Sequence, residues 1–271
     1  MPELPEVETT RRGVSPYLLG ATLQGAVVRE SRLRWPIPPD LEQKLTGLTV
    51  RAVTRRAKYL VIHFDTGFLL IHLGMSGSLR YIPATTAPEK HDHVDLLLGS
   101  HVLRYRDPRR FGAMLWHTGP LEFHPLLKDL GPEPLSDDFD GSRLYAAIHK
   151  RATAIKLAIM DNHVVVGVGN IYANESLFHA GICPTRAARD LRLSDCQRLA
   201  DEIRKVLRRA IERGGSTLRD FVNTEGQSGY FQQEYFVYDR HDAPCRVCGS
   251  PIRQIRQGQR SSYYCPLCQP C

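Results

Sequence analysis

The chain has 271 residues, with 36 Lys and Arg against 29 Asp and Glu, so its formal net charge is +7. This length is enough for two domains that each bury a core. It contains no apolar run of about 18 residues and no apolar segment near residue 1, so we expect neither a membrane span nor a secretion signal. Basic residues cluster at 51–58, 104–110 and 204–209, which favours a polyanionic partner, above all nucleic acid.

The first six residues, Met1-Pro-Glu-Leu-Pro-Glu, permit two interpretations. Removal of Met1 would leave Pro2 with a secondary α-amine that is partly unprotonated near neutral pH. Such an amine can attack a carbonyl-like carbon and form a cationic iminium, an electron sink, with Glu3 beside it as a proton donor. Alternatively, the segment is an ordinary first helical turn, because it places proline and acidic residues at the positive end of a helix predicted over about 5–12.

From there to about residue 117, short apolar or alternating runs predict β-strands. The runs occupy 26–28, 59–64, 68–72, 94–98 and 102–105, with turn signals at 65–67 and 99–100. No helical pattern separates them, so we expect an antiparallel sandwich or barrel instead of a parallel sheet.

Two glycine-bounded loops interrupt this strand-rich half. The first, His72-Leu-Gly-Met-Ser-Gly77, places Met75 between glycines, and the second, Asp107-Pro-Arg-Arg-Phe-Gly112, places Arg109 beside Phe111. Met and Phe are usually core residues, but loop tips are poor places for a core. Proteins that distort duplex DNA insert apolar wedges between base steps, and Arg reads base edges, so these loops have a composition suited to DNA.

An acidic, proline-rich stretch near residue 131 predicts a linker, and beyond it the pattern becomes helical. We expect domains at 1–130, 151–240 and 241–271, with the linker region at 131–150. The clearest helix covers 195–213, with a capping box of Ser194 and Gln197 at its start. A second helical stretch opens at Gly167-Val-Gly-Asn170, where glycine-flanked amides and the Asn170 side chain could bind phosphate.

Two C-x2-C pairs, Cys245 with Cys248 and Cys265 with Cys268, have the spacing of a structural zinc site whose four thiolates leave no open position for catalysis. Cys271 forms another such pair with Cys268, so it could replace Cys265. No disulfide framework is expected, and Cys183 and Cys196 are interpreted as lone structural cysteines. Four arginines and no acidic residue lie between Cys245 and Cys271, which suits a finger that contacts phosphates.

Together these features resemble the bacterial formamidopyrimidine-DNA glycosylase family over essentially the whole chain. The matching motifs are residues 1–8, 55–58, 72–77, 90–93, 107–112, 167–172 and the zinc finger. The resemblance implies an α+β fold with an N-terminal β-sandwich, a short N-terminal helix, and a helical domain with a helix–two-turn–helix motif and a zinc-finger hairpin. It also implies a monomeric glycosylase and AP lyase of the bacterial cytoplasm. Such an enzyme excises 8-oxoguanine and formamidopyrimidines from duplex DNA and cleaves the strand by β,δ-elimination.

The resemblance also implies individual roles. Pro2 would attack C1′ of the damaged nucleoside, Glu3 would assist base loss, and Lys58 and Arg260 would donate protons in β- and δ-elimination respectively. The residues 217–238 match the family's lesion-capping loop. The implied DNA contacts are His91, Arg109, Arg151, Lys156 and Asn170, with Met75, Arg109 and Phe111 filling the gap left by the flipped nucleotide.

Two other hypotheses remain open at this point. An endonuclease VIII-like glycosylase would act on oxidised pyrimidines, but its first residues typically read Pro-Glu-Gly-Pro, whereas this chain has Leu4. A non-catalytic, zinc-containing DNA-binding protein would use Pro2 and Glu3 merely to begin a helix. The endonuclease VIII-like hypothesis differs from the formamidopyrimidine-DNA glycosylase hypothesis in substrate. The DNA-binding hypothesis differs from it in having no covalent chemistry.

Overall fold

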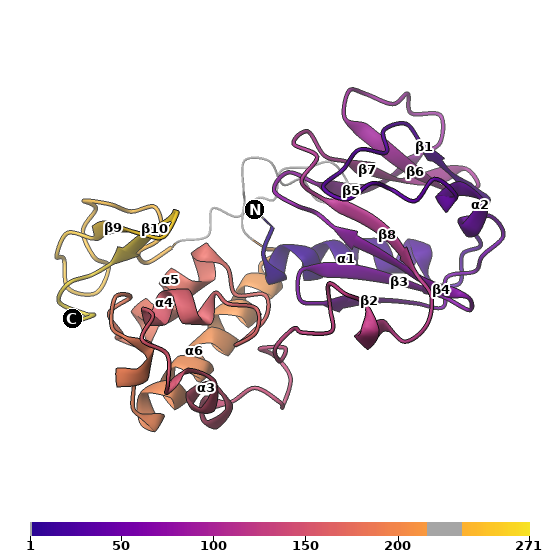
Figure 1. Ribbon diagram of the computed structural model, residues 1–271. Coiled ribbons are helices and arrows are strands. Elements are labelled where there is room, and N and C mark those ends of the chain that lie inside the picture. The colour runs from indigo at the N-terminus through magenta and orange to yellow at the C-terminus, as the bar shows by residue number, and fades with distance from the viewer. Residues whose placement is uncertain (1, 216–234) are drawn as a thin grey trace. The chain divides into compact units, whose positions relative to one another are not determined.

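The computed structural model describes residues 2–215 and 235–271, and these form two compact units (Figure 1). Of these residues, the first unit consists of 2–128 with 213–215, and the second consists of 129–212 with 235–271. Among the described residues, no helix has the length and apolar character needed to cross a membrane.

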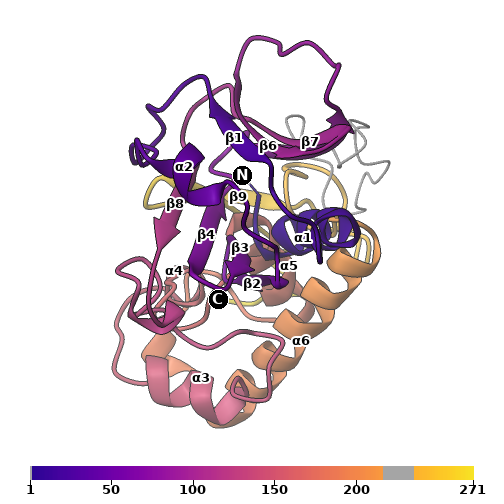
Figure 2. The same cartoon turned by 90° about the vertical axis from the view of Figure 1, so that its right-hand side faces the viewer.

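The first unit is a sandwich of two antiparallel, four-stranded sheets, as predicted (Figure 2). One sheet has the order β1-β6-β7-β5, formed by Gly25–Val28, Asp92–Leu98, His101–Arg106 and Ser78–Pro83. The other has the order β2-β3-β4-β8, formed by Ala52–Arg56, Tyr59–Phe64, Gly67–His72 and Ala113–His117. The five predicted strands are present, but β2, β5 and β8 were not predicted. All three are edge strands, as β1 is, and half-buried or exposed positions interrupt their apolar pattern.

Helix α1 (Leu4–Leu18) closes one side of this sandwich, because it contacts β2 and β5, an edge strand of each sheet. It is longer than the predicted helix over 5–12. The reason is that Val14 and Leu18 continue the buried stripe begun by Leu4 and Val7. The short helix α2 (Leu41–Leu45) packs on β1. The apolar faces of both sheets and of α1 share one hydrophobic core.

The second unit is helical and ends in a hairpin. Its helices are α3 (Gly141–Ile148), α4 (Ile155–Ile159), α5 (Asn170–His179) and α6 (Leu193–Glu212), and the hairpin is β9 (Arg253–Gln257) with β10 (Arg260–Tyr264). Helix α3 packs against α6 (Figure 2). The range 131–150, expected to be a linker, therefore contains a helix, which begins where Asp140 Oδ1 accepts a hydrogen bond from Arg143 N at 2.7 Å.

Helix α6 matches the predicted helix over 195–213 but begins two residues earlier. The predicted Ser194–Gln197 capping box is wrong, because the carboxylate of Asp195 makes the cap: its Oδ2 accepts from Arg192 N at 3.1 Å. Its buried stripe includes Leu199, Ile203 and Leu207, as the 3.6-residue period predicts.

Helix α5 connects the parts of the second unit that lie far apart in sequence. The buried carboxylate of Glu175 accepts three backbone hydrogen bonds, from Phe236, Val237 and Tyr238, at 2.9–3.0 Å. The neighbouring Asn174 Oδ1 accepts from Tyr263 N of β10 at 2.8 Å. The end of the chain is therefore fixed to one helix by two adjacent side chains.

We expect Glu175→Gln to lower the free energy of unfolding by about 2–4 kcal/mol, because an amide would turn a donor toward backbone N–H groups that need an acceptor. Urea unfolding measures the loss. Glu212→Gln, at an exposed position near the end of α6, is the matched control and should change stability by less than about 0.5 kcal/mol. Equal effects of the two variants would contradict this role for Glu175.

Candidate active site and metal centre

The predicted site residues are divided between the two units. The first unit carries Pro2, Glu3, Lys58, Met75, His91, Arg109 and Phe111, and the second carries Arg151, Lys156, Asn170, Arg260 and the four paired cysteines. Residues 217–234 of the expected capping loop lie outside the described residues.

Pro2 and Glu3 are both buried at the start of α1. Glu3 is 3% exposed, adopts an extended backbone, and donates its N–H to Glu6 Oε2 at 2.7 Å. Glu6 is itself fully buried. The Glu6 carboxylate thus fixes the backbone of Glu3, the residue that precedes the helix. A helix start and a positioned Pro2–Glu3 pair are therefore compatible.

Contacts of α1 with β2 show which way the helix points. Arg11 Nη1 donates to Val53 O at 3.2 Å, and the Arg55 guanidinium lies 3.4 Å from Glu8 Oε2. Moving toward the beginning of α1 therefore means moving toward the end of β2. The first turn of the helix, with Pro2 and Glu3, points toward the turn between β2 and β3 that carries Lys58.

The two glycine-bounded loops reach the same end of the second sheet as Lys58. In the register, Tyr59 pairs with His72 and His72 pairs with Ala113, so the turn before β3, the loop after β4 and the loop before β8 lie together. Both loops are also crossings between the sheets: residues 73–77 lead from β4 to β5, and residues 107–112 lead from β7 to β8.

The carboxylate of Asp107 holds the two crossing loops together. It is fully buried, accepting from Ser76 Oγ at 2.7 Å and from Gly112 N at 2.8 Å. The Ser76 hydroxyl in turn accepts from Arg109 N at 3.1 Å. The backbones also touch, since a Cβ on Gly74, whose φ is +61°, would lie 2.5 Å from Gly112 N. Only glycine permits this approach.

The loop tips present the three predicted wedge residues. The Phe111 side chain is 46% exposed, and the Arg109 guanidinium carbon lies 5.0 Å from the centre of its ring. Met75 is half-buried on the other loop. Phe111 therefore lies at the surface of its loop and outside the hydrophobic core, where a ligand can reach it.

His91 lies on a neighbouring turn in the left-handed region, with a φ of +76°. Its carbonyl accepts from Asp107 N at 3.1 Å, so this turn is attached to the same aspartate. Arg80 fixes the next residue through its 3.0 Å ion pair with Asp92. His91 lines a pocket of about 410 Å³ together with Arg110 and other polar residues.

His72 at the end of β4 is kept neutral. Burial, followed by the positive charges of Lys58 and Arg34, lowers the pKa of His72 to about 4. The uncharged ring uses Nδ1 to accept the Gly74 N–H at 3.0 Å, which sets the turn leading to Met75. The sequence motif contains this histidine, but nothing local indicated its structural task.

In the second unit, the predicted phosphate cradle opens α5. Gly169 is the residue before the helix and Asn170 is its first residue. Gly167 takes the left-handed conformation at φ +79°, which brings the chain into the helix. The side-chain oxygen of Asn170 is buried, and it makes no hydrogen bond within residues 2–215 and 235–271.

Two other residues that were predicted to contact DNA, Arg151 and Lys156, bind groups within the protein. Arg151 Nη1 lies 2.6 Å from Asp161 Oδ2 in an ion pair. Lys156 is fully buried, and its Nζ donates to Ser261 O at 2.8 Å and to Ser262 Oγ at 2.7 Å. Lys156 thus supports β10 directly after the exposed Arg260. The apolar neighbours of Lys156 in sequence, Ile155 and Leu157, were the available signal for its burial.

The four paired cysteines form one metal site. The Sγ atoms of Cys245, Cys248, Cys265 and Cys268 all lie within 4.8 Å of one another. Two of the separations are 3.9 and 3.4 Å, close to the roughly 3.8 Å edge of a tetrahedron with zinc–sulfur bonds of about 2.3 Å. The donor set therefore fits one structural zinc ion.

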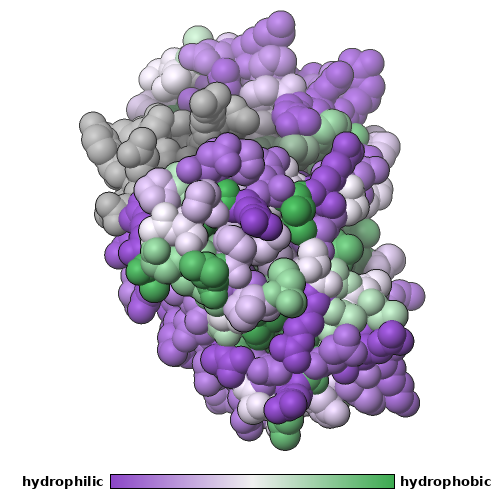
Figure 3. Space-filling view, turned by 90° about the vertical axis from the view of Figure 1, so that its left-hand side faces the viewer, coloured by the Kyte–Doolittle hydropathy of each residue, from purple (hydrophilic) through white to green (hydrophobic). Residues whose placement is uncertain are grey.

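Cys271 is not a ligand, because it forms a disulfide with Cys183. This settles the choice between Cys265 and Cys271 and corrects two expectations: Cys183 is not a lone cysteine, and the chain contains a disulfide. The zinc hairpin carries exposed arginines. These arginines are Arg246, Arg253, Arg256 and Arg260. Hydrophilic residues cover much of the surface shown in Figure 3, with apolar patches among them.

Family models match three consecutive parts of the chain. They describe the formamidopyrimidine-DNA glycosylase N-terminal domain at residues 1–114, the formamidopyrimidine-DNA glycosylase H2TH domain at 130–222, and a zinc finger found in FPG and IleRS at 243–270. With the sandwich, the helical unit and the four-cysteine hairpin in this order, the chain has the architecture of a DNA glycosylase with an H2TH domain and a zinc finger.

Individual relatives agree over the full length. A formamidopyrimidine-DNA glycosylase from Thioalkalivibrio sulfidiphilus is 58% identical, over 99% of this chain and 100% of that protein. The crystal structure of MutM (Fpg) from Thermus thermophilus is 37% identical with a TM-score of 0.88, covering 99% of this chain and 98% of the other. Lactococcus lactis Fpg, solved with N7-benzyl-Fapy-dG containing DNA, is 33% identical with a TM-score of 0.90, covering both chains completely. The chain belongs to the formamidopyrimidine-DNA glycosylase family.

We expect Gly74→Ala to lower the free energy of unfolding by at least about 3 kcal/mol, because it adds a collision with the Gly112 backbone to the cost of a positive φ. Gly20→Ala is the control: Gly20 has a φ of +79° but nothing within 4 Å of its added Cβ, so it should lose only about 1 kcal/mol. Urea unfolding compares the two. Similar losses would show that the loops do not interlock at Gly74.

The His72 environment predicts a pH-dependent contribution to stability. Its folded-state pKa of about 4 lies below the unfolded value of 6.5, so the unfolded chain binds the proton more readily between these values. Stability should therefore fall as the pH falls from 6.5 to 4, with His72 contributing up to about 3 kcal/mol of the loss. His72→Asn keeps an acceptor for Gly74 without this titration, so the stability gap between wild type and variant should narrow over this range in urea titrations. A constant gap would contradict the assignment.

Proposed function

We propose that this protein excises oxidised purines, 8-oxoguanine and formamidopyrimidines, from duplex DNA and then cleaves the strand at the abasic site. The observation that carries this proposal is the full-length 58% identity to a formamidopyrimidine-DNA glycosylase, with Pro2 and Glu3 at the start of α1. We further propose that it acts as a monomer on DNA in the bacterial cytoplasm.

In this mechanism the nucleophile is the α-amine of Pro2, exposed as an amine by removal of Met1. Its nitrogen attacks C1′ while the bond between C1′ and the base breaks, and Glu3 supplies the proton that assists base loss. The nitrogen, now bound to C1′, loses its N–H proton, and the sugar ring then opens: the C1′–O4′ bond breaks, O4′ takes up a proton, and the nitrogen lone pair forms an iminium with C1′. This iminium has no N–H to lose and remains cationic. Burial of Glu3 next to Pro2 supports this role, because it holds the carboxyl group away from bulk solvent.

The iminium then withdraws electrons from the sugar. Loss of the C2′ proton allows the 3′ phosphate to leave in β-elimination, and the 5′ phosphate follows in δ-elimination. We assign Lys58 as the proton donor of the first step and Arg260 as that of the second. The direction of α1 toward the Lys58 turn supports the first assignment, and the exposure of Arg260 at the start of β10 supports the second.

The crossing loops serve the flipped state of the DNA. A base that is taken out of the stack leaves a gap, and extrusion costs a few kcal/mol. We propose that Met75, Arg109 and Phe111 fill this gap, with Arg109 facing the orphaned cytosine. Their fixed positions on interlocked loops support the proposal, because a wedge that is already ordered pays little conformational entropy on binding.

The remaining DNA contacts hold the backbone. We propose that the amino end of α5 with Asn170, together with His91 and Arg151, binds phosphates near the lesion. Lys156 contributes there through β10, since its ammonium supports the strand that begins at Arg260. Zinc bound by the four cysteines would stabilise the hairpin and supply no chemistry, because its coordination is complete.

Borohydride trapping tests the covalent step. Incubation with a duplex containing 8-oxoguanine opposite cytosine, followed by borohydride, should yield a protein–DNA adduct that peptide mass spectrometry places at Pro2. We expect Glu3→Gln to lower base excision at least about 100-fold, because its amide cannot donate an acidic proton. Pro2→Gly should weaken strand cleavage. Glu212→Gln should behave as wild type.

Three outcomes would contradict the proposal. Failure to form an adduct with any lesion, despite verified loss of Met1, would favour a non-catalytic DNA-binding protein. A preference for thymine glycol duplex would instead indicate an enzyme for oxidised pyrimidines. Normal excision by Glu3→Gln would remove Glu3 from the mechanism and leave Pro2 as the tested nucleophile.

A further inference from the structure

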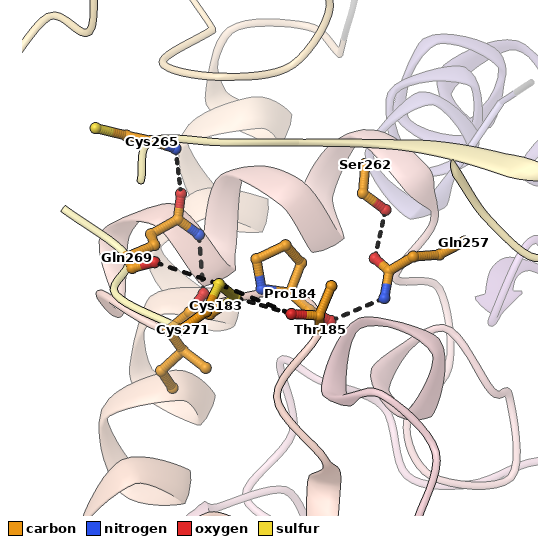
Figure 4. Close-up of a disulfide and its surroundings, with 9 residues drawn as sticks. Cys183, Pro184, Thr185, Gln257, Ser262, Cys265, Gln269 and Cys271 are labelled. Carbon is orange, nitrogen blue, oxygen red and sulfur yellow. Dashed lines mark hydrogen bonds between the residues drawn. A yellow bond between two sulfur atoms is a disulfide. The ribbon is translucent and has the colours of Figure 1, made fainter. Parts of the chain in front are cut away.

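The disulfide between Cys183 and Cys271 joins the zinc hairpin region to the loop that follows α5. The two residues are 88 positions apart, and their Cα atoms are 5.1 Å apart, within the range that disulfides span. Figure 4 shows the bridge beside Pro184 and Thr185 of this loop, with Gln269 approaching from the second cysteine pair of the zinc site. Neither cysteine belongs to the metal site.

A buried glutamine connects the bridge to a zinc ligand. Gln269 is fully buried; its Oε1 accepts from Cys265 N at 3.0 Å, and its Nε2 donates to Ile182 O at 2.8 Å (Figure 4). Gln269 N also donates to Cys265 O at 2.9 Å. The Gln269 side chain therefore joins Ile182, the residue before Cys183, to the zinc ligand Cys265. The disulfide at Cys271, two residues after Gln269, links the same two segments covalently.

The two sulfurs differ in access. Cys183 is fully buried, whereas Cys271 is exposed. Thr185 Oγ1 lies 3.0 Å from Cys183 Sγ and 3.7 Å from Cys271 Sγ, so the hydroxyl flanks both atoms. A dissolved reagent reaches Cys271 first, and Cys183 lies directly behind it as the second thiol. This arrangement suits exchange with a small disulfide.

We propose that Cys183 and Cys271 form a reversible thiol–disulfide site that reacts with small disulfide oxidants such as glutathione disulfide, and that its oxidised form slows loss of zinc from the neighbouring finger. The inference does not depend on the glycosylase activity. It concerns two residues that lie outside the metal site and outside the proposed catalytic residues.

The exchange balances as a two-electron reaction. The Cys271 thiolate attacks one sulfur of glutathione disulfide, the oxidant's S–S bond breaks, and one glutathione thiolate leaves. The Cys183 thiolate then attacks the Cys271 sulfur and releases the second glutathione. Two electrons pass from the cysteine pair to the oxidant, and the two thiol protons end on the released glutathiones. Excess reduced thiol reverses both steps.

The expected effect on zinc follows from the position of the bridge. Cys265 and Cys268 must move away from the metal before a chelator can take it. In the reduced protein, breaking the Gln269 hydrogen bonds frees this segment from the α5 loop. In the oxidised protein the covalent bond keeps it near the site, so the thiolates rebind zinc at high effective concentration.

Zinc-loaded full-length protein provides the test. One sample is treated with glutathione disulfide and another with a phosphine reductant, and alkylation with peptide mapping reports the linkage of Cys183 to Cys271. Excess EDTA is then added, and zinc release is followed. We expect oxidised protein to release zinc at least about tenfold more slowly and to melt at least about 4 °C higher.

Variants separate the bridge from general thiol chemistry. Cys271→Ser, at an exposed position, should abolish the redox dependence of zinc release while the protein still binds zinc, and Cys183→Ser should do the same. Cys196→Ser removes a buried cysteine outside both sites and should keep the dependence. Three results would overturn the proposal: no linked peptide after oxidation, equal zinc release in the two redox states, or a redox dependence that survives Cys271→Ser.

Discussion

The carboxylate of Asp107 is the interaction on which the first unit's candidate site depends. It satisfies a hydroxyl of one crossing loop and a backbone amide of the other, and both are buried with it. An unpaired carboxylate at this depth would cost several kcal/mol, so the loops keep their contact as a unit. The close approach of Gly74 to Gly112 then leaves a single backbone arrangement. The neutral His72 ring adds a further hydrogen bond to the first loop, because its Nδ1 accepts the N–H of Gly74.

The second unit fixes its hairpin in a different way, by a small apolar cluster that includes Phe178, Ile252 and Tyr263 together with polar contacts. Polar side chains of the helical part bind its backbone: Asn174 and Lys156 contact β10, and Gln269 joins the second cysteine pair to the α5 loop. These contacts pair polar groups that are buried or partly buried. Metal coordination and hydrogen bonding therefore stabilise the same short segment, and its conformation reflects both.

Much of this architecture could be predicted from local patterns. The inner strands β3, β4, β6 and β7 carry short apolar runs that are buried along most of their length, and the cysteine spacing indicates the metal site directly. The outer strands β2, β5 and β8 lacked that pattern. Lys156 and Ser262 are 106 residues apart, and Cys183 and Cys271 are 88 apart, so no local signal reports either contact. The sequence motif around Pro2 predicts a nucleophilic amine. The direction of α1 toward Lys58 could be established only from the contacts between α1 and β2.

The crossing loops have a consequence for how such a protein can diverge. Each loop has one end in one sheet and the other end in the opposite sheet, so an inserted or deleted residue would shift the registers of two sheets at once. The turn at 65–67 joins neighbours within a single sheet and lacks this restriction. Evolution can therefore alter the chemistry at the tips of the crossing loops by exchanging side chains at 75, 109 and 111, while the lengths of those loops stay fixed.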